Sequence, residues 1–249
     1  MGVPQWDPDT CPKNFSIAVI AKRRSGKSTW LKHMCYEHWR KYYPYVEVFT
    51  DTKFNGFYQD FVDERCIHEG WDEVKVKAIM DRQRKMKAVM QKLPRRHQES
   101  VCCLIILDDV LSVRYSHTLE QIMLQGRHFD ISVVCCLQDA TILSKKMRDN
   151  LDVIVSFRQA NKDNRERLVH SFMAVTTYEE GEKMLMDCTC EDYCVCVIDN
   201  TMNAYNLQDF VYWHKVDEVP PQRFKMGCNM DKHNTFKKQQ MAPTVARIM

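Results

Sequence analysis

Residues 21–28 have the types and spacing of a loop that binds phosphate. They read Ala-Lys-Arg-Arg-Ser-Gly-Lys-Ser, between an apolar run that ends at Ile20 and a helical pattern that continues through Met34. A strand, such a loop and a helix in this order direct backbone N–H groups and a helix N-terminus toward an anion. The predicted nucleotide-binding residues are Ala21, Lys22, Arg23, Arg24, Ser25, Gly26, Lys27, Ser28 and Thr29.

The chemistry predicted for this loop is that of a site for ATP and Mg²⁺. Lys27 reaches the β- and γ-phosphates, and the Ser28 hydroxyl ligates Mg²⁺. The usual pattern, G-x-x-x-x-G-K-[ST], has glycine where this chain has Ala21. Alanine suits that position only with a negative φ, so we expect a negative φ at Ala21.

Two acids end another apolar run. Residues 101–107 are all apolar, and Asp108 and Asp109 follow them directly. Such a run is typical of a central parallel strand, and ligands bind at the carboxyl ends of these strands. We predict that Asp108 holds the Mg²⁺ shell and that Asp109 polarises the water that attacks the γ-phosphate.

Two further side chains have two interpretations each. Gln138 follows the buried run 131–137, where it could sense the γ-phosphate and orient water, or merely begin a loop. Arg127 is either a surface arginine or a finger that completes the site of a neighbouring subunit. The sequence leaves both alternatives open.

The rest of the chain alternates strand-like and helical runs, which predicts an α/β fold. We expect a P-loop NTPase of the ASCE or RecA-like type, with a mainly parallel sheet flanked by helices and a C-terminal hairpin. The predicted strands are 17–20, 45–50, 66–68, 101–110, 131–137, 152–157 and 193–198, with a partner strand near Tyr205 and 211–213. The predicted division is a lead-in at 1–14, an ATPase domain at 15–227 and a flexible basic tail at 228–249.

Composition limits the class of protein. The 249 residues carry a formal net charge of only +3, so net charge alone does not argue for nucleic acid. No signal peptide opens the chain, and no apolar stretch approaches the roughly 20 residues of a membrane span. Cys102-Cys103 and Cys135-Cys136 lie inside apolar runs, where cysteine acts as a small hydrophobe. We therefore expect a soluble, reduced, intracellular protein.

Residues 72–96 predict a long helix with an uneven charge. It is either an ordinary solvated face or a surface that touches nucleic-acid phosphates. Three acids oppose nine bases, and the bases are Lys75, Lys77, Arg82, Arg84, Lys85, Lys87, Lys92, Arg95 and Arg96.

A cysteine cluster near the end of the chain also allows more than one interpretation. Cys188, Cys190, Cys194 and Cys196 form two C-x-C pairs, a spacing that suits tetrahedral zinc poorly. The alternation of Cys194, Cys196 and Ile198 suits one face of a strand. We favour core cysteines over a metal site or redox chemistry.

Together, residues 21–28, Asp108-Asp109, Gly126-Arg127-His128 and Gln138 resemble the packaging ATPases of large double-stranded DNA viruses, which belong to the FtsK/HerA group of P-loop motors. The resemblance covers most of residues 14–227, and its most specific part is 125–134. The stretch 145–158 looks like the family's final sheet strand with its arginines, among them Arg148.

This resemblance implies a homo-oligomeric ring that uses ATP to move double-stranded DNA into a preformed capsid. It further implies that Arg127 or Arg148 acts on a neighbour's site, with capsid, portal or inner-membrane virion proteins as partners. Host cytoplasm or the virion is the implied location. Two alternatives stay open: a nucleoside or nucleotide kinase with Arg158, Arg165 and Arg167 as a lid, and an assembly protein that binds ATP without hydrolysing it.

Overall fold

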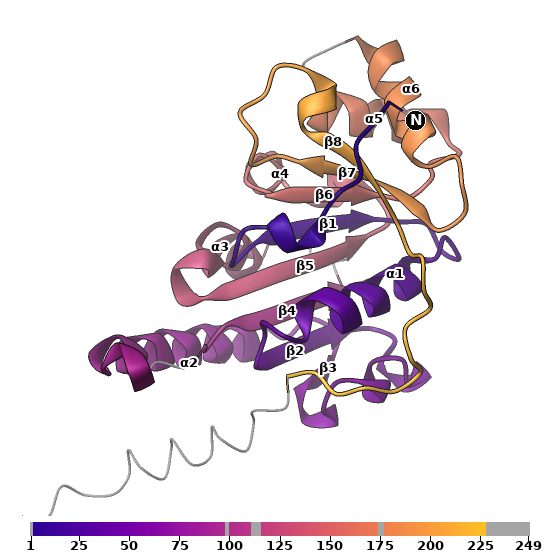
Figure 1. Cartoon of the computed structure of the whole chain (residues 1–249). Coiled ribbons are helices and arrows are strands. Elements are labelled where there is room, and N and C mark those ends of the chain that lie inside the picture. The colour runs from indigo at the N-terminus through magenta and orange to yellow at the C-terminus, as the bar shows by residue number, and fades with distance from the viewer. Residues whose placement is uncertain (1, 98–99, 111–115, 174–176, 228–249) are drawn as a thin grey trace, which may run out of the picture.

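The strands of this protein form one sheet in which parallel pairing predominates. A computed structural model describes residues 2–97, 100–110, 116–173 and 177–227. Within these residues the sheet has eight strands in the order β3-β2-β4-β5-β1-β6-β7-β8. The first six strands in this order, from β3 at the edge to β6, pair in parallel. Strand β7 is antiparallel to both of its neighbours, β6 and β8 (Figure 1). This confirms the predicted α/β class with a C-terminal hairpin.

An α-helix follows each of β1, β3, β4 and β5, and two follow β6, whereas only 3₁₀ helices lie between β2 and β3. The strands are β1 (Ser16–Ile20), β2 (Tyr45–Thr50), β3 (Ile67–Glu69), β4 (Cys103–Asp108), β5 (Ile131–Leu137), β6 (Val153–Ser156), β7 (Cys194–Asp199) and β8 (Val211–Lys215). The α-helices are α1 (Lys27–His33), α2 (Glu73–Lys92), α3 (His117–Gln125), α4 (Lys145–Arg148), α5 (Lys162–Phe172) and α6 (Tyr178–Cys188).

The sheet separates two hydrophobic layers because successive strand residues point to opposite faces. Ala18 and Ile20 face a layer formed with α2, α3, α4, α5 and α6. Ile17 and Val19 face the other layer, which α1, the N-terminal segment and the segment after β2 cover. All five residues of β1 are buried, as the apolar run predicted for a central strand.

The helix after the phosphate-binding loop changes its geometry halfway. The sequence predicted a helix that continues through Met34, but α1 ends at His33 and a π-helix, Met34–Trp39, continues it. A π-helix is rare and is often associated with a functional site. The pattern of apolar residues did not reveal this change.

The N-terminal residues pack against the last strand. The N–H of Trp6 donates to the carbonyl of Trp213 at 2.8 Å, and the N–H of Trp213 donates to the carbonyl of Pro4 at 3.0 Å. The predicted domain limits stay a prediction, and the tail at 228–249 lies outside the described residues. No helix in the described part of the chain is long and apolar enough to cross a membrane.

The cysteine cluster divides between core and surface. Cys188, Cys194 and Cys196 are buried, and Cys196 packs with Ile198 on one face of β7, as the alternation predicted. Cys190 is exposed and is not a core cysteine.

Candidate nucleotide-binding site

The carboxyl ends of four parallel strands meet at one edge of the sheet. Thr50 of β2 pairs with Asp108 of β4, and Asp108 pairs with Cys136 of β5. Leu137 of β5 pairs in turn with Ile20 of β1. The phosphate-binding loop therefore begins two strands away from the two acids, at the edge where ligands bind in such sheets.

The loop has the backbone conformation that its sequence demands. Ala21 is not among the residues with positive φ, and its N–H donates to the carbonyl of Leu137 at 2.9 Å. Gly26 has a φ of 92°, and Arg24 has a φ of 61°. Glycine adopts this left-handed region without the penalty that a Cβ atom brings, so Gly26 suits the turn into α1. The expected negative φ at Ala21 is confirmed.

Lys27 joins the loop to the acidic strand. Its Nζ lies 2.6 Å from Oδ1 of Asp108 and 3.1 Å from Oδ2 of Asp109. The side chains of Lys27 and Asp108 are 14% and 10% exposed, so water screens their interaction weakly. Asp109 is more open, with one third of its side chain exposed.

The acids control the charge of Lys27. Burial by itself would lower the pKa of the amine, yet this pKa lies above its ordinary value, and the carboxylates of Asp108 and Asp109 are among the groups that raise it. The neighbouring Cys136 thiol is neutral because burial raises its pKa well above the usual value. The amine of Lys27 therefore stays protonated and positively charged at this edge of the sheet.

Tyr58 positions Asp108, a contact that the sequence did not predict. The Tyr58 hydroxyl donates to Oδ2 of Asp108 at 2.9 Å, while Lys27 binds the other carboxylate oxygen. Tyr58 is 2% exposed, and burial raises the pKa of its hydroxyl, so the phenol stays protonated as a donor. Both oxygens of Asp108 thus have fixed partners.

An open cavity of about 420 Å³ lies over these residues. The lining residues Thr52, Asn55 and Phe57 come from the segment after β2 and were not predicted. The only signal for them was that the neighbouring strand ends at the same edge. The predicted lining residues are Ala21, Lys22, Arg23, Arg24, Gly26, Lys27, Ser28, Thr29, Asp108, Asp109 and Gln138.

The donor set fits Mg²⁺. The Ser28 hydroxyl lines the cavity and donates to no group in the described part of the chain, and the Asp108 carboxylate lines the same cavity. Mg²⁺ prefers hard oxygen ligands, commonly one or two from the protein, with water and phosphate oxygens completing the shell. Ser28 and Asp108 are therefore suitable residues to hold it.

The structure brings Gln138 to the cavity but not the two predicted arginines. Arg127 lies just before β5, so the length of that strand, roughly 20 Å, separates it from Gln138. Arg148 lies in α4, and its guanidinium donates to the carbonyl of Leu143. Neither arginine lines the cavity of its own chain.

The basic surface of α2 is smaller than the sequence predicted. Arg82 is largely removed from solvent, because it forms an ion pair with the buried Glu47 on β2. Lys87 is half-buried and pairs with Asp130 at 2.8 Å. Lys77 and Arg84 pair with acids on the helix itself. Bases that stay exposed on or just after the helix include Lys75, Lys85, Lys92 and Arg95.

The strand order, the loop at 21–28 and the acids Asp108 and Asp109 show that this protein has the fold of the P-loop NTPases. Comparison with known families then identifies its relatives: the family described as poxvirus A32 protein matches residues 9–239, and the chain belongs to that family. This confirms the resemblance to viral packaging ATPases. A protein of Acanthamoeba polyphaga mimivirus is 28% identical over 232 residues, covering 89% of this chain and 79% of the relative. Protein 075L of Invertebrate iridescent virus 6 is also 28% identical over 232 residues, covering 91% and 86%.

Solved structures support the fold. The genome packaging NTPase B204 of Sulfolobus turreted icosahedral virus 2, in complex with ATP-gammaS, has a TM-score of 0.54 at 13% identity. That match covers 82% of this chain and 98% of B204. The pCW3 conjugation coupling protein TcpA with ATPgS has a TM-score of 0.56 at 12% identity, covering 96% and 75%. At these identities the likeness concerns the fold alone.

Proposed function

We propose that this protein is an ATP-hydrolysing motor that translocates double-stranded DNA and packages a viral genome into a capsid. The observation that carries the proposal is the arrangement at the sheet edge: the Lys27 amine bridges Asp108 and Asp109 across the cavity of the phosphate-binding loop. Membership of the poxvirus A32 protein family and the fold shared with the packaging NTPase B204 support it.

Each residue at the edge has one task in this proposal. Lys27 binds the β- and γ-phosphates, and Ser28 and Asp108 hold Mg²⁺, which supplies positive charge to the phosphate oxygens when bound. Asp109 accepts the proton of the attacking water, and Gln138 orients that water. Asp109 suits this task because its carboxylate is more exposed than that of Asp108.

The ion pairs of Lys27 imply an order of events. A nucleotide triphosphate brings negative charge into the cavity, and it competes with the acids for the amine. When Lys27 turns to the phosphates, Asp109 loses its partner and becomes free to accept a proton. Binding of ATP would therefore create the base that the reaction needs.

DNA contact is proposed for the exposed bases of α2. A motor that moves along any sequence must grip phosphates rather than base edges. Lys75, Lys85 and Lys92 are exposed, and no ion pair is found for them among the described residues. The tail residues Lys237 and Lys238 are further candidates outside those residues.

A ring of identical subunits would complete the site. Arg127 and Arg148 lie away from the cavity of their own chain, as an arginine that serves a neighbour must. Such an arginine stabilises the charge that develops on the transferred phosphoryl group. We propose action in the host cytoplasm or the virion, with capsid, portal or inner-membrane virion proteins as partners.

A small-molecule kinase fits the structure less well. The arginines that would form its lid are held by other groups. Arg158 donates to the carbonyls of Thr189 and Cys190. Arg165 pairs with Glu182 at 2.6 Å, and Arg167 pairs with Asp139 at 3.0 Å. A protein that only binds ATP would not need Asp109, which the catalytic proposal uses.

The rate of ATP hydrolysis, measured with and without duplex DNA, tests the proposal. We expect basal hydrolysis that duplex DNA of any sequence stimulates and that Lys27→Ala abolishes. Nucleoside-dependent consumption of ATP without stimulation by DNA would indicate a kinase. Tight ATP binding with no hydrolysis under either condition would indicate the non-hydrolysing alternative.

A further inference from the structure

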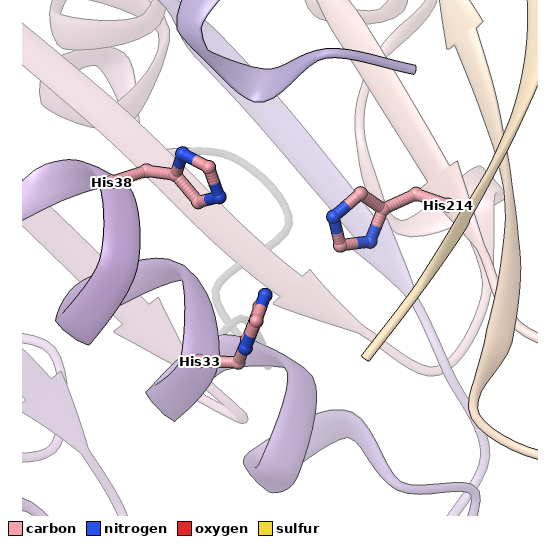
Figure 2. Close-up of side chains that lie close together, drawn as sticks. All are labelled: His33, His38 and His214. Carbon is pink, nitrogen blue, oxygen red and sulfur yellow. The ribbon is translucent and has the colours of Figure 1, made fainter. Parts of the chain in front are cut away.

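Three histidines from two distant parts of the chain converge on one point. His33 and His38 follow the phosphate-binding loop, and His214 lies on β8. One possible ligand atom from each ring lies within 4.8 Å of those of the other two. In Figure 2 a nitrogen of each ring points into the space that the rings share.

The π-helix is what places two of these rings together. In an α-helix of 3.6 residues per turn, residues five positions apart lie on different faces. The hydrogen bonds of a π-helix run from residue i to residue i+5, so its wider turn aligns His33 with His38. The π-helical turn therefore accounts for the approach of His33 and His38.

Hydrogen bonding within the protein accounts for only part of the cluster. His33 is 9% exposed, and its Nδ1 is buried with no hydrogen-bond partner among the described residues. His214 is 4% exposed. The His33 ring also has a hydrogen bond with the backbone of Glu218, so Nδ1 is the one nitrogen of the ring that lacks a partner in the described part of the chain. Buried polar atoms normally have partners, so this nitrogen needs another explanation.

We propose that His33, His38 and His214 bind a zinc-type divalent transition-metal ion. Three imidazoles with a fourth position for water form a common Zn²⁺ site, and imidazole suits Zn²⁺ better than Mg²⁺. The site is separate from the Mg²⁺ site, because His33 lies more than one helical turn after Ser28. It would fasten the helix that follows the phosphate-binding loop to β8.

Asp9 gives one ligand its orientation. Oδ1 of Asp9 lies 3.1 Å from Nδ1 of His38, and the carboxylate also pairs with Lys41 at 3.0 Å. A carboxylate on one ring nitrogen keeps the proton there and leaves Nε2 free for a metal. The site would thus also hold the N-terminal segment in place.

Trp30 opposes metal binding at His214. The Trp30 indole N–H donates to Nδ1 of His214 at 3.2 Å, which places the ring proton of a neutral His214 on Nε2. A metal at Nε2 requires the proton to move to Nδ1, and the indole must then give up its bond. Tetrahedral ligands at about 2.1 Å from Zn²⁺ lie roughly 3.4 Å apart, so the rings must also close inward.

Metal titration of the full chain tests this proposal. The protein is treated with a chelator, kept reduced with a phosphine, and titrated with Co²⁺ and then Zn²⁺ in excess Mg²⁺. We expect one ion per chain and the visible absorption of tetrahedral Co²⁺ with nitrogen and oxygen ligands, which Zn²⁺ displaces. Zn²⁺ should also raise the melting temperature. A spectrum dominated by charge transfer from thiolate would place the ion on cysteines and overturn the proposal.

Matched variants locate the ion. His38→Gln should lower the affinity at least 10-fold and abolish the rise in melting temperature, whereas the exposed His117→Gln should change neither. Asp9→Ala should weaken binding by about 10- to 100-fold. Trp30→Phe should strengthen it, because the competing donor is gone. Equal affinity in the wild type and in His38→Gln would overturn the proposal even if His214 variants fail to fold.

Discussion

Arg82 and Glu47 form an ion pair that crosses from α2 to β2 beneath the surface of the protein. Nη1 of Arg82 lies 2.7 Å from Oε1 of Glu47, and the two side chains are 12% and 4% exposed. His68 approaches the other carboxylate oxygen at 2.8 Å. The guanidinium therefore holds the long basic helix on the sheet, and it is not part of a surface that DNA can reach.

Loss of Arg82 should therefore reduce stability rather than DNA affinity. Arg82→Ala leaves the Glu47 carboxylate buried without the guanidinium that pairs with it. This loss should lower the free energy of unfolding by roughly 3–5 kcal/mol. Lys85→Ala removes an exposed base of the same helix and should change stability by less than about 0.5 kcal/mol. Urea unfolding of both variants measures the difference. Equal stabilities would show that the pair is no anchor.

The DNA surface should respond to the exposed bases alone. The double reversal Lys85→Glu with Lys92→Glu should weaken binding of duplex DNA, and each lost phosphate contact should reduce the log–log salt slope by about 0.9. The reversal Lys162→Glu with Lys183→Glu changes the net charge equally on α5 and α6 and serves as the control. If both doubles weaken DNA binding alike, α2 is an ordinary solvated face.

Tyr58 should matter for the Mg²⁺ dependence of ATP hydrolysis. Tyr58→Phe removes the hydroxyl that fixes Oδ2 of Asp108, so more Mg²⁺ should be needed for half-maximal activity. Tyr43→Phe is a matched control, since its buried hydroxyl bonds to Ser132 at 2.7 Å near the opposite end of the sheet. Each variant should lose about 1 kcal/mol of stability. A shifted Mg²⁺ requirement in both, or in neither, contradicts this assignment.

Asp109→Asn should separate chemistry from folding. Asp109 has a φ of 58°, a left-handed conformation that asparagine adopts readily, so the variant should fold normally. It should keep ATP bound and lower kcat by about 10²- to 10⁴-fold, the range for a lost general base. Lys27→Ala should lose turnover and bind nucleotide more weakly. Hydrolysis at the wild-type rate in Asp109→Asn would remove this residue from the catalytic role.

The sequence predicted best those features that depend on residues close together along the chain. The loop at 21–28 and the acids at the end of β4 could be placed because parallel strands bring their carboxyl ends to one edge. Tyr58 could not be placed, since it lies in a short 3₁₀ helix and its partner Asp108 is 50 residues away along the chain. Arg82 was assigned to a basic face because its acid, Glu47, lies 35 residues away on a strand.

The histidine cluster was missed for a related reason. His33 and His38 are five positions apart, which no α-helical pattern would place together. Only the π-helix aligns them, and β8 then brings His214 from 176 positions beyond His38. Helix geometry and strand pairing decide such a site together.

The two predicted arginines should act on a neighbouring subunit. Arg127 and Arg148 do not line the cavity of their own chain, so an Ala variant of either should bind ATP normally. If one of them completes a neighbour's site, that variant should hydrolyse ATP poorly, because the charge on the transferred phosphoryl group lacks its partner.

Mixing two inactive variants tests this directly. Arg127→Ala keeps an intact Lys27, and Lys27→Ala keeps an intact Arg127, so a mixed assembly contains interfaces that pair an intact loop with an intact arginine. Hydrolysis should then partly recover, and the same should hold for Arg148→Ala if that residue is the finger. Cross-linking confirms that the subunits assemble together. If hydrolysis does not recover with either arginine variant in mixed assemblies, neither arginine completes a neighbour's site. Each would then act within its own chain or be an ordinary surface residue.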